Sequence, residues 1–322
     1  IFDNSDDGSD TLLILILFKF SIAESIETKA KQLLLFDVET NTIIFEKNAD
    51  ELMSPSSMSK IMTLYLLFKK IDEGEFSLED EFEVSKKAWK KGGSRMFVNL
   101  YSKVKVEDLI RGVIVQSGND ACIVVAEGVS GSEEMFVEEL NSLAKEIGLN
   151  NSHFKNSTGW PDPEHLMTAR DLLTLSLRTI KDYPEFYHYY AEKEFVYNKI
   201  KQLNRNPLLF SNSYADGLKT GHTSLGGYGL VSSVKKNDRR LILILNGLKT
   251  NISRRKESEK LIKLGFNQFK NINITDKNEM IKKTPVWGGK KKLLEMYSQE
   301  KISITVPKKI KKKVKLFIKY HS

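Results

Sequence analysis

Residues 55–68 read PSSMSKIMTLYLLF, a short polar segment followed by an almost unbroken apolar run. Such a run predicts a helix that is apolar nearly all round, and a helix of that kind is stable only when other elements surround it. We therefore expect a central, buried helix. Pro55 marks the start of this helix, and Ser57 and Lys60 follow it, three residues apart.

Ser57 and Lys60 would share one face of the helix, about one turn apart. A buried helix start offers unpaired N–H groups and a partial positive charge, which would stabilise an oxyanion beside Ser57. A lysine in a desolvated cleft near a second cation has a lowered pKa and can act as a base. The pair alone fits a helix cap and a solvated lysine better, because Ser-x-x-Lys occurs eight times in this lysine-rich chain.

Two rarer strings follow along the chain, SGN at residues 117–119 and KTG at residues 219–221. The first supplies a second hydroxyl and an amide, and the second supplies a cationic strand that can hold a carboxylate. Lys219 is the candidate for the second cation, Gly221 lets a substrate lie close to the strand, and His222 is expected to contribute its backbone N–H. The three strings in this order predict an acyl-transferring serine enzyme that acts on a peptide ending in a free carboxylate.

Length and composition indicate a globular protein with one large and one small domain. The chain has 322 residues, of which 40% are hydrophobic and 29% charged. The net charge of +8 is concentrated in residues 263–322, which hold 16 lysines, 4 acidic residues and no arginine. Nucleic-acid binding is not expected from such a tail. A solvated lysine-rich face is the first interpretation, and contact with anionic lipid or a cell-wall polymer is the second.

The first residues resemble an export signal. Residues 12–20 form an apolar run that is too short to span a bilayer. Ser21 and Ala23 are small residues at the positions that a signal peptidase reads, which predicts cleavage before Glu24. The preceding flank is acidic and the chain lacks an initiator methionine, so we expect the true start to be missing or altered. Residues 1–23 are therefore interpreted as a signal-peptide-like segment, and the protein is expected to be exported.

Neither cysteine nor histidine chemistry is expected. Cys122 is the only cysteine, which excludes an intramolecular disulfide, and it is interpreted as a small buried residue of a helix. The five histidines lack the spacing of a metal site, so no metal is expected. Trp160 is expected to anchor its loop, with a place in the lining of the cleft as the alternative.

The secondary structure predicts a fold of the α+β class, an antiparallel sheet flanked by helices, because hairpin-length links join the later strands. Strands are expected at residues 32–37, 42–45, 194–197, 217–223, 227–233 and 240–246, and helices at 106–115, 120–129, 132–147, 168–182 and 253–269. Thr168 is the expected N-cap of its helix, with Asp171 as the capping-box partner. The catalytic domain is assigned to residues 24–271.

Residues 272–322 are assigned to a partial, β-rich C-terminal domain, with alternating segments at residues 302–306 and 314–318. A segment of this size is small for a core of its own, and it ends just after a strand, so we expect it to be truncated.

Longer strings around the three motifs carry a resemblance to a known family. They are PSSMSKIMT at 55–63, LIRG at 109–112 leading into QSGNDAC at 116–122, QLNRN at 202–206 and DGLKTGHT at 216–223. The chain resembles the low-molecular-mass penicillin-binding proteins that are serine-type D-alanyl-D-alanine carboxypeptidases of the D-Ala-D-Ala carboxypeptidase A group. The similarity runs from about Lys31 to the end. It implies a β-lactamase/transpeptidase-like catalytic domain, no cofactor, and a C-terminal β domain followed by an amphipathic helix on the membrane.

The resemblance also implies a mechanism, in which Ser57 forms an acyl-enzyme with a peptidoglycan stem peptide and the terminal D-alanine leaves. Lys60 takes the proton of Ser57, and Ser117 with Lys219 passes a proton to the leaving D-alanine. The other implied contacts are an oxyanion hole at the N–H groups of Ser57 and His222, a substrate amide at Asn119, and a terminal carboxylate at Lys219, Thr220 and Arg254.

The expected partners are stem peptides and β-lactam antibiotics, with contact at the membrane surface as a further expectation. The expected location is the periplasm or another extracytoplasmic space, with attachment to the outer face of the inner membrane left open. Two alternatives remain. One is a related acyl-enzyme, namely a peptidoglycan endopeptidase, a transpeptidase or a β-lactamase. The other is an inactive peptidoglycan-binding protein.

Overall fold

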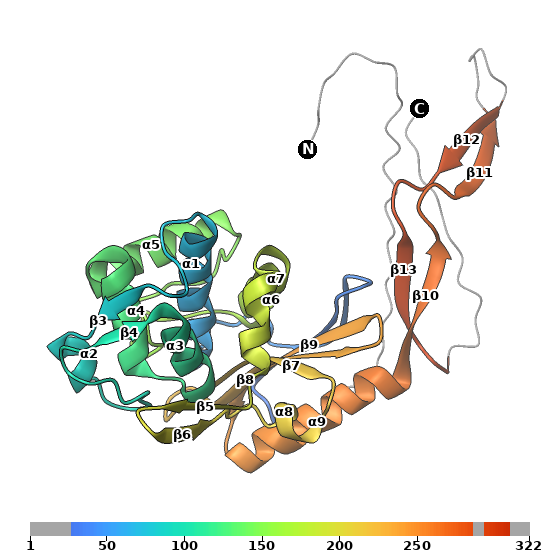
Figure 1. Ribbon diagram of the computed structural model, residues 1–322. Coiled ribbons are helices and arrows are strands. Elements are labelled where there is room, and N and C mark those ends of the chain that lie inside the picture. Colours follow the sequence, from blue (N-terminus) through green and yellow to red (C-terminus); the bar gives the residue numbers. More distant parts are fainter. Residues whose placement is uncertain (1–26, 286–292, 310–322) are drawn as a thin grey trace. The chain divides into compact units, whose positions relative to one another are not determined.

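The computed structural model describes residues 27–285 and 293–309, most of which lie in one compact unit, Thr28–Lys308. Its centre is a five-stranded antiparallel sheet with the strand order β2-β1-β9-β8-β7 (Figure 1). The strands are β1 Gln32–Asp37, β2 Thr42–Lys47, β7 Ala215–Thr223, β8 Gly227–Lys236 and β9 Arg239–Leu248. The predicted antiparallel sheet is thus confirmed, and β7 forms one of its edges.

Helices cover both faces of this sheet, which explains why every residue of β1 is buried. Alternate side chains of a strand point to opposite faces. Leu34 belongs to the core cluster on the side of helix α6 (Ala169–Asp182), whereas Leu35 lies against Gly265 of helix α9 (Asn251–Gln268). An apolar strand without polar alternation therefore fits a sheet that is covered on both sides.

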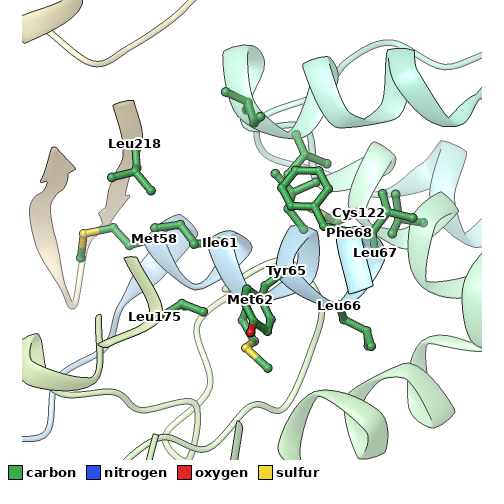
Figure 2. Close-up of a cluster of buried hydrophobic side chains, with 14 of the residues drawn as sticks. Met58, Ile61, Met62, Tyr65, Leu66, Leu67, Phe68, Cys122, Leu175 and Leu218 are labelled. Atoms are coloured by element: carbon green, nitrogen blue, oxygen red, sulfur yellow. The ribbon is translucent and has the colours of Figure 1, made fainter. Parts of the chain in front are cut away.

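Helix α1 (Lys60–Asp72) is the buried central helix that the apolar run predicts. Its residues from Lys60 to Phe68 are all buried, and α4 (Asn119–Ser130), α5 (Glu133–Glu146) and α6 pack around it. Figure 2 shows the labelled side chains of this cluster, with Cys122 of α4 beside Leu67 and Phe68 of α1. Cys122 is fully buried, as expected, and burial raises the pKa of its thiol to about 12.

The long helices and strands are present as predicted. Most of the short elements were not predicted. Helices α4, α5, α6 and α9 lie within a few residues of their predicted bounds, and strand β5 (Glu194–Tyr197) matches its prediction. The unpredicted elements of the catalytic region include β3 Glu81–Glu83, α2 Lys86–Lys90, β4 Lys103–Lys105, α7 Pro184–Tyr187, β6 Ile200–Leu203 and α8 Leu208–Ser211. Each spans too few residues to show a helical or strand period.

The helix predicted at residues 106–115 is divided. It begins as α3 (Val106–Arg111), and the next turn, Gly112–Gln116, widens into a π-helix. The π-helix ends at Ser117, whose backbone is left-handed with a φ of 63°. A widened turn of this type is often found at functional sites, and here it sets the position of the serine that follows it.

The predicted N-cap of α6 is confirmed, but its capping box is wrong. The hydroxyl of Thr168 accepts a hydrogen bond from the backbone N–H of Asp171 at 3.0 Å. The Asp171 carboxylate, however, accepts from the N–H of Asn151 at 2.8 Å and from the hydroxyl of Ser152 at 2.7 Å. The carboxylate therefore holds the preceding loop to the helix start.

Two strand pairs follow α9, described as β10 Phe269–Thr275 with β13 Ile302–Pro307, and β11 Met280–Pro285 with β12 Leu293–Tyr297. The strand predicted at residues 302–306 is confirmed as β13, and the one predicted at 314–318 lies outside the described residues. The predicted boundary at residue 271 stays a prediction. None of the helices in the described part of the chain is long and apolar enough to cross a membrane.

His165 lies in the loop between α5 and α6 and is 2% exposed. Its Nδ1 accepts a hydrogen bond from the N–H of Lys155 at 3.2 Å, and its ring packs edge-on against Phe154. Burial lowers the pKa of His165 to about 4, while Asp162 raises it and Lys60 lowers it further. The imidazole is therefore neutral in the folded protein at neutral pH.

This burial predicts a loss of stability in acid. Above the unfolded pKa of about 6.5 both states hold a neutral imidazole, and as the pH falls toward about 4 only the unfolded state takes up the proton. The contribution of His165 to the free energy of unfolding should thus fall by about 3 kcal/mol over this window. Urea unfolding of the wild type and of His165→Gln across this range measures it, since the variant cannot titrate. Equal slopes for the two proteins would contradict the prediction.

Candidate active site

Ser57 lies on a short 3-10 helix, η1 (Ser56–Ser59), directly before α1. Two glycines allow other segments to approach this turn closely. A Cβ at Gly159, where φ is +72°, would overlap the carbonyl of Ser56, and a Cβ at Gly221 would lie 2.9 Å from the carbonyl oxygen of Pro55. The lack of a side chain at Gly221, which was expected to admit substrate, thus allows strand β7 to lie against η1.

Lys60 reaches three oxygen atoms from inside the core. Its Nζ lies 2.8 Å from Ser57 Oγ, 2.8 Å from Asn119 Oδ1 and 2.5 Å from the carbonyl oxygen of Thr158. Two of these oxygens can only accept, so a neutral amine would use its two hydrogens on them. Its lone pair would then face the hydroxyl hydrogen of Ser57, which is the arrangement that a general base requires.

The pKa of Lys60 is lowered to about 8, and burial of the fully enclosed amine is the main cause. Arg205 and Lys91 are the cations that lower it further, while Cys122 and Asp120 raise it. Lys219, expected as the second cation, is itself affected, because Lys60 lowers the pKa of Lys219. The expected coupling between the two lysines is therefore present, and Arg205 and Lys91 are additional cations near Lys60.

Ser117 and Lys219 form a second hydroxyl–amine pair. Lys219 Nζ donates to Ser117 Oγ at 2.9 Å and to the carbonyl oxygen of Thr220 at 3.2 Å. Lys219 is 1% exposed, and its pKa is lowered well below the usual value, first by burial and then by Lys60 and Arg205. A buried amine of this kind can exchange a proton with the hydroxyl beside it.

Asn119 begins α4 and connects the base to the wall of the site. Its Oδ1 accepts from Lys60, and its Nδ2 donates to the carbonyl oxygen of Gly92 at 2.9 Å. The amide nitrogen carries two hydrogens, so one remains for a substrate. The neighbouring Asp120 is buried and accepts from the N–H groups of Met96 and Phe97, which fixes the loop that follows Gly92.

Trp160, expected to anchor its loop, is 44% exposed, and the loop is held at this residue through its backbone. The anchor is Asn156, whose side chain accepts from the N–H groups of Thr158 and Trp160 and donates to the carbonyl oxygen of Trp160. The ring of Trp160 lies beneath the ammonium of Lys91 at 4.8 Å. Asn156 thereby holds the loop whose Thr158 carbonyl accepts from Lys60.

Arg254 and Arg205 add two further cations. Arg254, in the first turn of α9, donates to Asn251 Oδ1 at 2.6 Å, and its guanidinium lies over the ring of Tyr228. Burial lowers the pKa of Arg254 to about 10 and also lowers that of Arg205, which donates to Ser94 Oγ at 2.7 Å. Within the described residues, neither arginine and neither buried lysine forms an ion pair.

A cavity of about 940 Å³ joins these groups. It is lined by Ser57, Ser117, Arg205, Thr220, Gly221, His222, Tyr228 and Arg254, among others. The ring of His222 is exposed and lies against that of Tyr228, with 3.9 Å between the ring centroids, and the His222 backbone belongs to β7. The structure thus brings all nine predicted site residues together, and the described residues contain no group of ligands suited to a metal ion.

Sequence reasoning missed Arg205, Lys91 and Thr158. Arg205 lies in the string QLNRN, which was noted without a role, and that string was the available signal. Thr158 contributes a backbone carbonyl, which no residue type reveals. Lys91 lowers the pKa of Lys60 only because the two residues are close in the folded chain. No sequence pattern around Lys91 indicates this contact.

The comparisons with known proteins agree with this geometry. Residues 19–250 match the model of the D-alanyl-D-alanine carboxypeptidase family, and residues 269–322 match that of the penicillin-binding protein 5 C-terminal domain. The D-alanyl-D-alanine carboxypeptidase DacC of Escherichia coli is 39% identical over 94% of this chain and 78% of its own length.

Solved structures are similar as well. Penicillin-binding protein 5 of Haemophilus influenzae matches with a TM-score of 0.80 and 36% identity, over 88% of this chain and 84% of that one. The carboxypeptidase DacD of Francisella tularensis matches with a TM-score of 0.82 and 30% identity, over 95% and 86%. The chain therefore belongs to the D-alanyl-D-alanine carboxypeptidase family, the serine peptidases among the low-molecular-mass penicillin-binding proteins.

Proposed function

We propose that this serine D-Ala-D-Ala carboxypeptidase uses Ser57 as its nucleophile and Lys60 as its base. The observation that carries the proposal is the contact of 2.8 Å between Lys60 Nζ and Ser57 Oγ, together with the two acceptor oxygens that occupy the remaining amine hydrogens. Such a pair activates a hydroxyl without a histidine.

The reaction follows in two steps. Ser57 Oγ attacks the carbonyl carbon of the penultimate D-alanine of a peptidoglycan stem peptide, while its proton passes to Lys60. The tetrahedral intermediate collapses, the C–N bond breaks, and the leaving amine takes a proton supplied through Ser117 and Lys219. Water then attacks the ester and restores the Ser57 hydroxyl, which releases the shortened peptide.

The remaining groups of the site bind the substrate. The N–H groups of Ser57 and His222 are proposed to stabilise the oxyanion. Asn119 is proposed to hold a substrate amide through its free N–H. Thr220 and Arg254, with Lys219 behind them, are proposed to bind the terminal carboxylate, because a buried cation without an anionic partner favours one.

Strand β7 gives the substrate its direction. It is an edge strand of the sheet, and an extended peptide can add to such an edge through backbone hydrogen bonds. A β-lactam resembles the peptide end and is proposed to acylate Ser57 in the same way. The signal-peptide-like residues 1–23 support an extracytoplasmic location, and the lysine-rich residues 263–322 support peripheral contact with an anionic membrane surface.

Ser57→Ala should abolish the acyl-enzyme. Mass spectrometry of the intact protein after mixing with benzylpenicillin should show an adduct on the wild type and none on the variant. Release of D-alanine from a D-Ala-D-Ala peptide should fall by at least about 10⁴-fold, as expected for loss of a nucleophile. Ser54→Ala, on the same segment, is the matched control. An adduct on the Ser57→Ala protein would refute the assignment.

The rate of acylation should rise with pH, because only neutral Lys60 can accept the proton. The rate constant should increase about tenfold per pH unit below the Lys60 pKa of about 8 and level off above it. Lys91→Gln removes a cation that lowers this pKa, so the midpoint should move to higher pH. Stopped-flow acylation by a chromogenic β-lactam measures both curves. Lys90→Gln, at the exposed neighbouring position, should leave the midpoint unchanged. A midpoint that moves in Lys90→Gln and not in Lys91→Gln would contradict the assignment of Lys60 as the titrating base.

Arg254→Ala should weaken the preference for a free carboxylate. A charge-assisted hydrogen bond contributes about 1.5–3 kcal/mol, so kcat/KM should fall by about 10- to 100-fold. The decisive comparison is a peptide ending in D-Ala-D-Ala against its carboxamide. Wild type and the control Arg178→Ala should prefer the acid to the same extent, and in Arg254→Ala this preference should be about 10- to 100-fold smaller. An undiminished preference in Arg254→Ala would exclude it from the carboxylate site.

A further inference from the structure

The cavity continues beyond the point where a D-Ala-D-Ala peptide would end. Its lining includes Ser57, Thr220 and Arg254 and extends to helices α8 and α9, which contribute Phe210 and Ile252. Its volume of about 940 Å³ is near the upper end of the range of about 300–1,000 Å³ for pockets that enclose whole ligands. The side chain of D-alanine is one methyl group, so the terminal residue would fill only the inner part.

A second hollow extends the cavity along the same helices. Its volume is about 470 Å³, and it shares Ser211 and Glu259 with the cavity. Figure 1 shows α8 beside α9, where these walls lie. We call the outer cavity and this hollow together the α8–α9 groove, defined by Phe210, Tyr214, Lys236, Ile252, Lys256, Glu259, Lys263 and Phe266.

The geometry of the reaction determines which part of a substrate faces this groove. The terminal residue carries a nitrogen, a carboxylate and a side chain. The nitrogen must lie near Ser57 and Ser117, and the carboxylate is proposed to lie at Thr220 and Arg254. Asn119, proposed to hold the acyl part, does not line the cavity. The side chain of the leaving residue is therefore the group that can continue past Arg254 into the groove.

The groove changes in character along its length. Phe210 and Ile252 are large apolar residues that are 54% and 68% exposed, and both line the first part. Exposed apolar residues that meet in a hollow favour contact with an apolar chain. Further along, Glu259 forms an ion pair with Arg255 at 3.0 Å, and this pair neutralises the negative charge of Glu259.

The outer part of the groove is consequently positive. Lys256 and Lys263 form no ion pair within the described residues, and the ammonium of Lys236 lies 5.3 Å from the centre of the Tyr214 ring. Apolar walls followed by unpaired cations fit an extended chain of methylene groups that ends in a carboxylate.

We propose that this enzyme also releases D-amino acids larger than D-alanine, with a preference for a long side chain that ends in a carboxylate. The inference rests on the proposed function, because it uses the same nucleophile and the same carboxylate site. The bond that breaks is again the amide between the penultimate D-alanine and the terminal residue. One water is consumed, and the free D-amino acid leaves with the proton that its nitrogen requires.

A series of peptides tests the preference. The peptides are diacetyl-L-Lys-D-Ala-D-X, with X as alanine, norleucine, 2-aminopimelate or lysine, and released D-X is measured by liquid chromatography with mass spectrometry. We expect kcat/KM for D-2-aminopimelate to equal or exceed that for D-alanine, and D-lysine to be about tenfold poorer than D-2-aminopimelate. A steady fall with side-chain size, independent of charge, would overturn the proposal.

Substitutions in the α8–α9 groove test whether this groove is the source of the preference. In Ile252→Asp and in Lys256→Glu, the ratio of kcat/KM for D-2-aminopimelate to that for D-alanine should fall about tenfold. Met135→Asp places the same charge on a residue of α5 that is 58% exposed, and it should leave the ratio unchanged. Acylation by benzylpenicillin checks that each variant is folded.

The two proposals fail differently in this experiment. If wild type releases no D-alanine and forms no adduct, the proposed function is wrong. If it releases D-alanine but the ratio is the same in wild type and in both groove variants, the groove inference alone is wrong.

Discussion

The structure depends on the burial of one amine, that of Lys60. Removing a charged ammonium from water costs several kcal/mol, so a buried lysine favours its neutral form. Burial follows from the apolar helix α1, in which every residue from Lys60 to Phe68 is buried, so the lysine has no solvated face available. The three oxygens around Nζ come from η1, from the start of α4 and from the loop at Thr158. Distant parts of the chain must therefore come together before Lys60 has the surroundings that are proposed to make it a base.

Cationic side chains are buried elsewhere in the pocket as well. Lys219 and Arg254 are also enclosed, and no carboxylate of the described chain is paired with either of them. Stability alone would favour an acidic partner here, because an unpaired buried charge is destabilising. In the proposed function, the vacant position suits a substrate that brings its own anion. Sites of this type often reduce the stability of the protein that carries them.

Sequence reasoning succeeded where the signal is local. Ser57 and Lys60 are three residues apart, and the strands and long helices repeat their pattern over many residues, so both could be predicted. It failed where the cause is tertiary. The π-helix before Ser117 inserts a single wider turn into an apolar segment that reads as ordinary helix. Likewise, Arg205 and Lys91 approach Lys60 only in the folded chain, and Asp171 binds its preceding loop because that loop happens to pack there.

The pairing of β1 with β9 has a consequence for how the protein is made. Gln32 lies opposite Asn246 and Asp37 opposite Leu241, so the centre of the sheet joins the two ends of the catalytic region. Closing so large a loop is entropically costly and slows folding. During synthesis, β1 and β2 emerge as a lone hairpin, and such a hairpin is marginally stable in water. The nascent chain thus remains without a finished sheet until β9 has emerged, which keeps it loosely folded for most of its synthesis.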